Sequence, residues 1–301
     1  MAEWRKVIPE GRDRLQSGVL VCVVGFLLMA PLPLMFIRSI HSPEIGVWLL
    51  KTAAISWTFG LLVWALRAAT PMAAFFGSWV CCLVTFWTGT FVLSPFKSGL
   101  APLITLFLLT FASTRAGKRR KVRLGLAEEK RGRNAAQIIA NLGMTGLVTV
   151  GGVFDVFDVL NNSVGGLYGF TFYAVPVALL AALCEATADT VSSEIGQAFG
   201  GMPLMLTTFR RVKAGTDGAV TVLGTGAGIL GAAVVAGVGM WAMRMDWRAS
   251  GLGFAGGVAG LFFDSLLGAT VERKGWLGND LVNFSSTVFA VGVALGFAIW
   301  F

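Results

Sequence analysis

Charge is what this sequence has least of. Asp, Glu, Lys and Arg make up 13% of the 301 residues, whereas hydrophobic residues make up 55%. Ordinary soluble domains carry about 25% charged residues. A chain this poor in charge does not fit a water-soluble globular enzyme, and the question becomes where its few charges lie.

Histidine and cysteine are also rare. The single His41 and the four cysteines form no Cys-x-x-Cys pair, which excludes a zinc site built from these residue types. The cysteines lie in apolar runs and act as small hydrophobic residues. The sequence also lacks a Gly-Lys-Ser/Thr motif and a Gly-x-Gly-x-x-Gly motif after a strand, so a soluble nucleotide-binding fold is excluded.

What the sequence has instead is a series of long apolar runs separated by short polar connectors. Such runs predict an all-α, polytopic transmembrane helical bundle. A β-barrel is excluded because the apolar residues are continuous and do not alternate with polar ones. The nine predicted spans cover residues 17–37, 45–66, 73–94, 99–114, 135–154, 167–188, 219–242, 252–271 and 281–301.

The positive charges favour one side of the membrane. They occur in the N-terminal tail, in a basic loop, and in the connectors that contain Arg67, Arg210 to Lys213, and Arg273-Lys274. The connector 155–166 on the other side carries Asp155 and Asp158 and no Lys or Arg. We therefore expect a cytosolic N-terminus, with an interfacial segment near Trp4 to Ile8. Arg244 and Arg248 are the exceptions, because this topology places them outside.

Carboxylates interrupt two of the apolar regions. Glu185 to Glu194 follows the run 172–183, and Asp264 lies inside another run. Charges at membrane depth are costly and usually face a polar cavity or a cation. On a helix Glu185, Asp189, Ser192 and Ser193 share a face, and a helix break near Gly196 would let Glu194 converge with them. Alternatively, Asp264 pairs with a basic residue between helices, and Glu185 is simply interfacial.

A further polar cluster begins the last span. It contains Asn279, Asp280 and Asn283, and Ser265 adds a hydroxyl beside Asp264. Carboxylate, hydroxyl and amide oxygens are hard ligands, which suit Mg²⁺ bound to phosphates. These clusters lie on the cytosolic side in the predicted topology.

The basic loop at residues 115–134 is a candidate anion-binding segment. It holds nine Lys and Arg residues, of which Lys118 and Arg133 lie nearest the spans. Arg forms bidentate pairs with phosphate, and Lys acts as a point charge. Alternatively, the loop only sets the topology and contacts anionic lipid headgroups.

The connector 196–218 is rich in glycine and ends in a second candidate phosphate site. Its backbone N–H groups, before a helix start, favour an anion. The candidate residues are Lys213, Gly215, Thr216, Asp217 and Gly218.

Several of these pieces together resemble a family of integral membrane proteins that includes the plant phytyl-phosphate kinase. The matching pieces run from about residue 68 to the end, in the order Ala69-Thr70-Pro71 with Gly77, Phe111 to Lys118, Arg133 to Asn141, Ala188 to Gly196, Gly215 to Gly218 with Gly224-Thr225, Gly253 to Gly256, Asp264 to Thr270, and Asn279 with Asn283. The Asp-Thr-x-Ser-Ser-Glu and Asp-Ser-Leu-Leu-Gly pieces are specific in combination. The family is distantly similar to dolichol kinase and the membrane CTP-transferases.

The resemblance implies two regions. Residues 1–67 comprise a tail and two spans without a counterpart, and residues 68–301 form a catalytic transmembrane domain that includes the basic loop. The sequence departs from the family at three positions, where the family often has Asn for Asp217, Gln for Glu272 and a second Asn for Asp280.

The implied activity is that of a membrane kinase. The resemblance implies transfer of a phosphoryl group from a nucleoside triphosphate, with CTP the first candidate, to an isoprenoid monophosphate such as phytyl phosphate. We assign Asp189, Glu194 and Asp264 to Mg²⁺, and Lys118, Arg133 and Lys213 to phosphates. Orientation or binding is assigned to Gln137, Asn141, Ser192, Ser193, Gly215, Thr216, Asp217, Gly218, Ser265, Asn279 and Asn283.

The expected partners are a nucleoside triphosphate, a prenyl monophosphate and membrane lipids, with no nucleic acid; a homodimer is left open. Two other functions also remain open. A cytidylyltransferase acting on a lipid phosphate would release pyrophosphate, whereas a kinase using CTP releases CDP. A transporter of phosphorylated lipids or small anions would use the carboxylates as a proton relay and need no nucleotide.

Overall fold

The computed structural model describes residues 8–89, 94–126, 132–160 and 168–299, with side chains left out at 152–160 and 168–172. The predicted charges Arg5, Lys6, Lys130 and Arg131, most of the predicted interfacial segment 4–8, and the side chains of Asp155 and Asp158 lie outside this description. The elements are α1 (Glu10–Met29), α2 (Leu32–His41), α3 (Pro43–Ala65), α4 (Pro71–Gly89), η2 (Pro95–Lys97), α5 (Leu100–Arg115), α6 (Lys118–Arg123), α7 (Ala135–Leu160), α8 (Tyr168–Phe199), β1 (Leu204–Met205), β2 (Ala219–Val220), α9 (Val222–Met243), α10 (Trp247–Leu267), η3 (Gly268–Glu272) and α11 (Asn279–Ala298).

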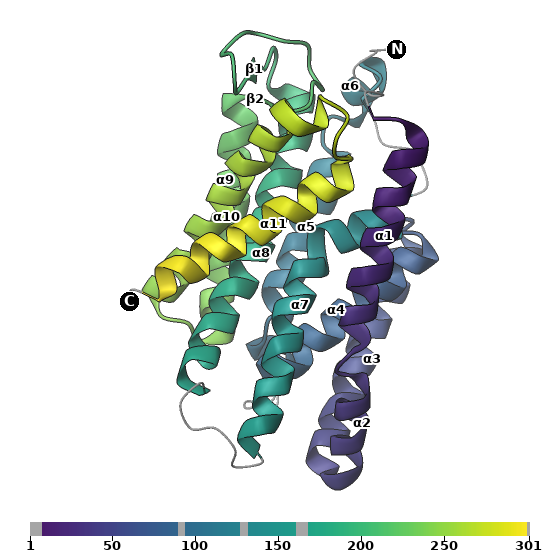
Figure 1. The fold of residues 1–301 in the computed structure, drawn as a ribbon, viewed down its shortest axis with the longest axis vertical. Coiled ribbons are helices and arrows are strands. Elements are labelled where there is room, and N and C mark those ends of the chain that lie inside the picture. Colours follow the sequence, from purple (N-terminus) through teal and green to yellow (C-terminus); the bar gives the residue numbers. More distant parts are fainter. Residues whose placement is uncertain (1–7, 90–93, 127–131, 161–167, 300–301) are drawn as a thin grey trace.

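Helices form the bundle that the apolar runs predict (Figure 1). Seven helical stretches of the described chain are long and apolar enough to cross a membrane: Glu10–His41, Pro43–Ala65, Pro71–Gly89, Tyr173–Phe199, Val222–Met243, Trp247–Glu272 and Asn279–Ala298. Two shorter apolar helices, Leu100–Arg115 and Ala135–Gly151, match the remaining predicted spans. The prediction of an all-α, polytopic membrane bundle is confirmed.

Helix α8 is the central element. In its apolar window 89% of the residues are buried inside the protein, compared with 22% in α3. Helices α5, α7, α9, α10 and α11 all pack against it. Alanines are frequent in this part of the sequence, and their small side chains allow neighbours to approach from several directions. The acidic stretch therefore lies on the helix that is most shielded from lipid.

Glycines on α9 and α10 bring these helices close to α8. A Cβ atom at Gly228 would lie 2.5 Å from the carbonyl oxygen of Ala188, and one at Gly257 would lie 2.9 Å from the amide nitrogen of Glu185. Gly226 and Gly237 meet nothing within 4 Å. Only some of the glycines on these helices therefore serve helix packing.

The helix break near Gly196 that would let Glu194 converge with Asp189 is not present. Helix α8 continues through Gly196 to Phe199. A Cβ atom at Gly196 would lie 2.9 Å from Thr221 Oγ1, at the start of α9. This glycine therefore permits close helix packing and leaves the helix regular.

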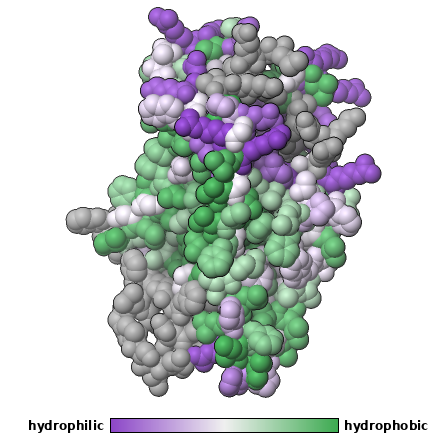
Figure 2. Space-filling view, turned by 45° about the vertical axis from the view of Figure 1, so that its right-hand side comes forward, coloured by the Kyte–Doolittle hydropathy of each residue, from purple (hydrophilic) through white to green (hydrophobic). Residues whose placement is uncertain are grey.

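Polar segments collect at one end of the bundle. Strands β1 and β2, helix α6 and the start of α1 lie at this end (Figure 1), and Figure 2 shows hydrophilic side chains gathered there above a hydrophobic body. The two strands pair antiparallel, with Leu204 opposite Val220. The sequence does not predict this pairing, because strands of two residues have no recognisable periodicity.

Candidate active site

A polar cavity of about 320 Å³ opens at this end, between α7, α8, α10, α11 and the β1–β2 connector. It brings together residues that are as far apart in the sequence as Leu126 and Asn283. Most of the predicted site residues line it: Arg133, Gln137, Asn141, Asp189, Ser192, Ser193, Glu194, Gly215, Thr216, Asp217, Gly218, Asp264, Ser265, Asn279 and Asn283. Lys118 and Lys213 are not part of its lining.

The cavity is rich in negative charge. Among the described residues that line it, Arg133 is the cation, and the carboxylates are Asp189, Glu194, Asp217, Asp264 and Glu272. Asp264 experiences the charges of Asp189, Glu185 and Glu272. An acidic cavity of this kind favours a cation, or an anion that arrives with one.

Asp264 on α10 is linked to α8 through Ser286 on α11. The Ser286 hydroxyl lies 2.6 Å from Glu185 Oε1 and 3.3 Å from Asp264 Oδ2. Because a hydroxyl has one hydrogen, it donates at any moment to one of these carboxylates or to the Asn283 carbonyl, which lies 2.8 Å away. Glu185 itself is 1% exposed and does not line the cavity. The sequence alone does not mark Ser286 as a site residue, since a serine in an apolar run is common in membrane helices.

Arg133 is held in place by its own backbone. Its N–H donates to the carbonyl of Ala68, and its carbonyl accepts from the N–H of Thr70, both at 2.9 Å. The guanidinium reaches α8, where it donates to Thr190 Oγ1 at 3.4 Å and interacts electrostatically with Asp189. Pairing with the segment before α4 thus fixes a cation beside a carboxylate of the central helix.

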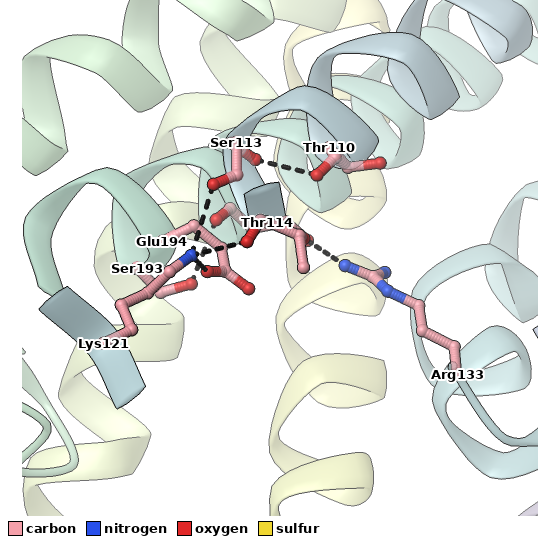
Figure 3. Close-up of polar contacts among 8 residues, drawn as sticks. Thr110, Ser113, Thr114, Lys121, Arg133, Ser193 and Glu194 are labelled. Carbon is pink, nitrogen blue, oxygen red and sulfur yellow. Dashed lines mark hydrogen bonds and ion pairs between the residues drawn. The ribbon is translucent and has the colours of Figure 1, made fainter. Parts of the chain in front are cut away.

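Glu194 is engaged elsewhere. Its carboxylate forms an ion pair with Lys121 of α6, and both side chains are almost fully buried. The Lys121 ammonium also donates to the carbonyls of Ser113 at 3.3 Å and Thr114 at 2.8 Å, which uses its three hydrogens. Figure 3 shows this cluster on one side of α8 and Arg133 approaching from another.

Lys121 was not singled out by the sequence. It stands in a run of cations, and the six residues of α6 have no periodic signal that marks one of them as buried. The local cause is Gly117, which has a φ of +61° and turns the chain from α5 into α6. A Cβ atom on Gly117 would lie 2.6 Å from Ala198 Cβ, so glycine also lets this turn approach α8.

The start of α7 presents amide groups to the cavity. Asn134 and Gln137 form a reciprocal cap, in which each side-chain oxygen accepts the other's backbone N–H at 2.9 Å. Asn141 donates to the Gln137 carbonyl at 2.7 Å. The Gln137 oxygen is therefore in use, and its NH₂ group is the part that remains for a ligand.

Asp280 and Glu272 differ in their surroundings. Asp280 accepts a hydrogen bond from Ser17 of α1 at 2.6 Å and does not line the cavity. Gln16 adds contacts to the same corner, to the N–H of Gly278 and the carbonyl of Trp276. Glu272 lines the cavity. Asp280 therefore helps to join the first and last helices.

The side chains that line the cavity allow a magnesium site with only one or two protein ligands. The described residues contain no group of three or more His, Cys, Asp or Glu side chains placed to hold a metal ion. Magnesium usually takes one or two protein carboxylates, and substrate phosphates and waters complete its coordination. Asp189 and Asp264 fit that pattern, and Glu194 does not, because Lys121 occupies it. Magnesium binding stays a prediction.

Comparison with known proteins identifies the family. Residues 54–291 match the integral membrane protein family DUF92. The membrane protein MJ0933 of Methanocaldococcus jannaschii is 33% identical over 198 residues, which are 66% of this chain and 74% of that protein. The chloroplastic protein VTE6 of Arabidopsis thaliana is 27% identical over 190 residues, 62% of this chain and 54% of VTE6. No solved structure matches. The chain is thus an integral, multi-pass membrane protein of the DUF92 family.

Proposed function

We propose that the protein is a membrane kinase that transfers a phosphoryl group from a nucleoside triphosphate, with CTP the first candidate, to an isoprenoid monophosphate such as phytyl phosphate. One observation carries the proposal. Asp189, Asp264 and Arg133, from α8, α10 and the segment before α7, face one polar cavity at the end of a membrane bundle. Neutralisation and positioning of phosphates is the main task of an enzyme for phosphoryl transfer.

The reaction suits these side chains. An oxygen of the lipid phosphate attacks the γ-phosphorus, a new P–O bond forms, and the nucleoside diphosphate leaves with the former bridging oxygen. The nucleophile is already ionised, so the protein needs no strong base. Arg133 donates to phosphate oxygens in a planar fork, and the NH₂ group of Gln137 offers a further donor.

The acidity of the cavity supports use of a metal–nucleotide complex. Its carboxylates would repel a bare triphosphate, because like charges oppose one another in a partly buried site. Magnesium held by Asp189 and Asp264 would neutralise phosphate charge. The two carboxylates then select the complexed nucleotide over the free one.

Two further observations support the proposed substrate class and the cytosolic location of the cavity. The resemblance to the family of the phytyl-phosphate kinase favours a prenyl phosphate, and the similarity to VTE6 is consistent with it. The polar end also carries Arg67, Arg133, Arg210 and Arg273, which favours a cytosolic location under the positive-inside rule. Nucleotides would then have direct access to the cavity.

Product analysis tests the proposal. The purified protein in nanodiscs is incubated with magnesium, each nucleoside triphosphate in turn, and geranyl to phytyl monophosphates, and the lipid products are identified by mass. We expect lipid diphosphate together with nucleoside diphosphate. Release of pyrophosphate would instead indicate cytidylyl transfer. Absence of any lipid product, with nucleotide-independent movement of the phosphate across vesicles, would indicate a transporter.

Removal of single carboxylates tests the site. We expect Asp189→Asn and Asp264→Asn each to lower kcat at least about a hundredfold, because preorganised charge is worth this much in comparable sites. Asp246→Asn is the matched control. Asp246 is the N-cap of α10, at the opposite end of this helix from Asp264, and its Oδ1 accepts the N–H of Ala249. Asn is about as good an N-cap residue as Asp. Equal loss in all three variants would contradict the assignment.

A further inference from the structure

A second cavity, of about 200 Å³, lies beside the first, between α3, α4, α5 and α7. Its walls are mainly apolar and include Phe59, Val63, Leu103, Leu106 and Phe107. The rings of Phe59 and Phe107 meet edge to face with centroids 5.1 Å apart, which joins α3 to α5 across this space.

Positive charge collects among the other lining residues of this cavity. Arg67, Arg115, Lys118 and Arg133 contribute to the lining. Lys118, which the sequence assigned to phosphate, thus lies here and not in the acidic cavity. Arg67 has a left-handed backbone with a φ of +55°, which is uncommon outside glycine, and a Cβ atom at Gly132 would lie 2.7 Å from its carbonyl oxygen. The backbone around Arg67 is therefore tightly packed against Gly132, the residue before Arg133.

The two cavities share a wall. Arg133, Asn141 and Glu194 line both of them. Lys121 neutralises Glu194, so among the described residues that line both cavities Arg133, which contacts Thr190 and lies near Asp189, is the cation that can bind an anion at the junction. A molecule with an apolar chain and an anionic head, placed in the second cavity, would present its head to Arg133 and to the acidic cavity beyond.

We propose that the second cavity binds the first part of the hydrocarbon chain of the prenyl phosphate, with its phosphate at Arg133. This inference rests on the proposed kinase function and adds where the lipid substrate lies. The volume is below the range of about 300–1,000 Å³ that is usual for small-molecule pockets. The cavity therefore holds only the chain near the phosphate, and the rest of the chain extends into the bilayer.

Gly77 of α4 provides a way to fill this cavity. It lines the cavity, and a Cβ atom added to it meets nothing within 4 Å. A leucine side chain at this position would occupy the space where we place the hydrocarbon chain of the lipid. Leucine also has a higher helix propensity than glycine. Gly237 on α9 is the control. It is also helical, an added Cβ atom there also meets nothing within 4 Å, and it is exposed and lies outside the cavity lining.

The experiment is photolabelling with a prenyl monophosphate that carries a diazirine on its first isoprene unit. The probe is added to the protein in nanodiscs without nucleotide, and labelled peptides are mapped by mass. We expect labels in 59–63 and 103–107, with a loss of about tenfold in Gly77→Leu and no loss in Gly237→Leu, since added atoms in a filled pocket cost this much. Competition by unlabelled prenyl monophosphate, and weaker competition by prenol or inorganic phosphate, is expected if both chain and head are bound.

The result separates the inference from the proposed function. Labels confined to other helices, or unchanged labelling in Gly77→Leu, would overturn the lipid site even if the protein makes lipid diphosphate. If the expected segments are labelled but the protein forms no lipid diphosphate with any nucleotide, the result would contradict the kinase function and still support the lipid-binding site.

Discussion

Lys121 differs from the other cations of the basic loop in its burial and in its contacts. Its neighbours Arg119, Arg120 and Arg123 are exposed, whereas Lys121 is buried and has three hydrogen-bond partners. A buried ammonium that is fully paired cannot bind a ligand without losing these partners. Lys121 therefore serves to hold α6 and the end of α5 against α8.

Truncation of one member of this ion pair should destabilise the protein. We expect Lys121→Met to lower the free energy of unfolding by about 3–5 kcal/mol, because Glu194 is left buried without a partner. The double variant Lys121→Met, Glu194→Gln should recover much of the loss. The control is Arg14→Ala, which breaks the exposed pair with Glu10 and should change stability by less than about 1 kcal/mol. Thermal unfolding in detergent gives the ranking, and a double variant as unstable as the single one would contradict the ion-pair explanation.

Helices α8 and α9 pack closely through glycines next to the acidic cavity. Gly224 and Gly228 of α9 lie against the α8 turns that carry Ser192 and Ala188, next to Asp189. Their lack of a side chain sets the distance between the two helices at the depth of the acidic cavity.

A paired substitution on α9 tests this contact. Gly228→Ala places a Cβ atom 2.5 Å from the Ala188 carbonyl oxygen and should lower the melting temperature and displace Asp189, with a loss of activity. Gly226→Ala, half a turn away, meets nothing within 4 Å and should be neutral or slightly stabilising, because alanine is the better helix former. Similar melting temperatures for the two variants would show that α9 can move aside.

The sequence predicted the helices better than their ends and contacts. Apolar runs identify spans because the bilayer imposes their length, and nine runs matched helices. The polar continuation of α8 to Phe199 has no apolar signal, so its last turns and the position of Glu194 were not predicted. Asp189 and Asp264 stood out as costly charges. The partners Lys121, Thr190 and Ser286 did not, because contacts between distant segments leave no local pattern.

For the whole molecule, the arrangement of charge predicts its orientation in the membrane. The polar end carries the acidic cavity and most of the arginines and lysines of the connectors. Arg244 and Arg248 lie where α9 ends and α10 begins, at the opposite end of α9 from β2, and Lys97 donates to the nearby Trp241 carbonyl. Orientation depends on the sum of such residues, so a few exceptions are tolerated.

Cysteine labelling tests the orientation. Of the four native cysteines Cys22 is exposed and the others are buried, so a Cys22→Ser background is used. With a membrane-impermeant maleimide on intact cells, we expect Arg248→Cys to react and Thr208→Cys to react only after permeabilisation. The opposite pattern would place the acidic cavity outside the cytosol and remove its direct access to nucleotides.

The central place of α8 has a consequence for the response to the lipid environment. When a bilayer is thinner or thicker than the hydrophobic length of a helix, the helix tilts or the bilayer changes thickness locally. This strain acts on the segments that contact the acyl chains. Here the outer helix α3 meets the acyl chains, and α8, with Asp189, is enclosed by protein. Turnover should thus vary little across phosphatidylcholines of different chain length, even where the tilt of the peripheral helices changes.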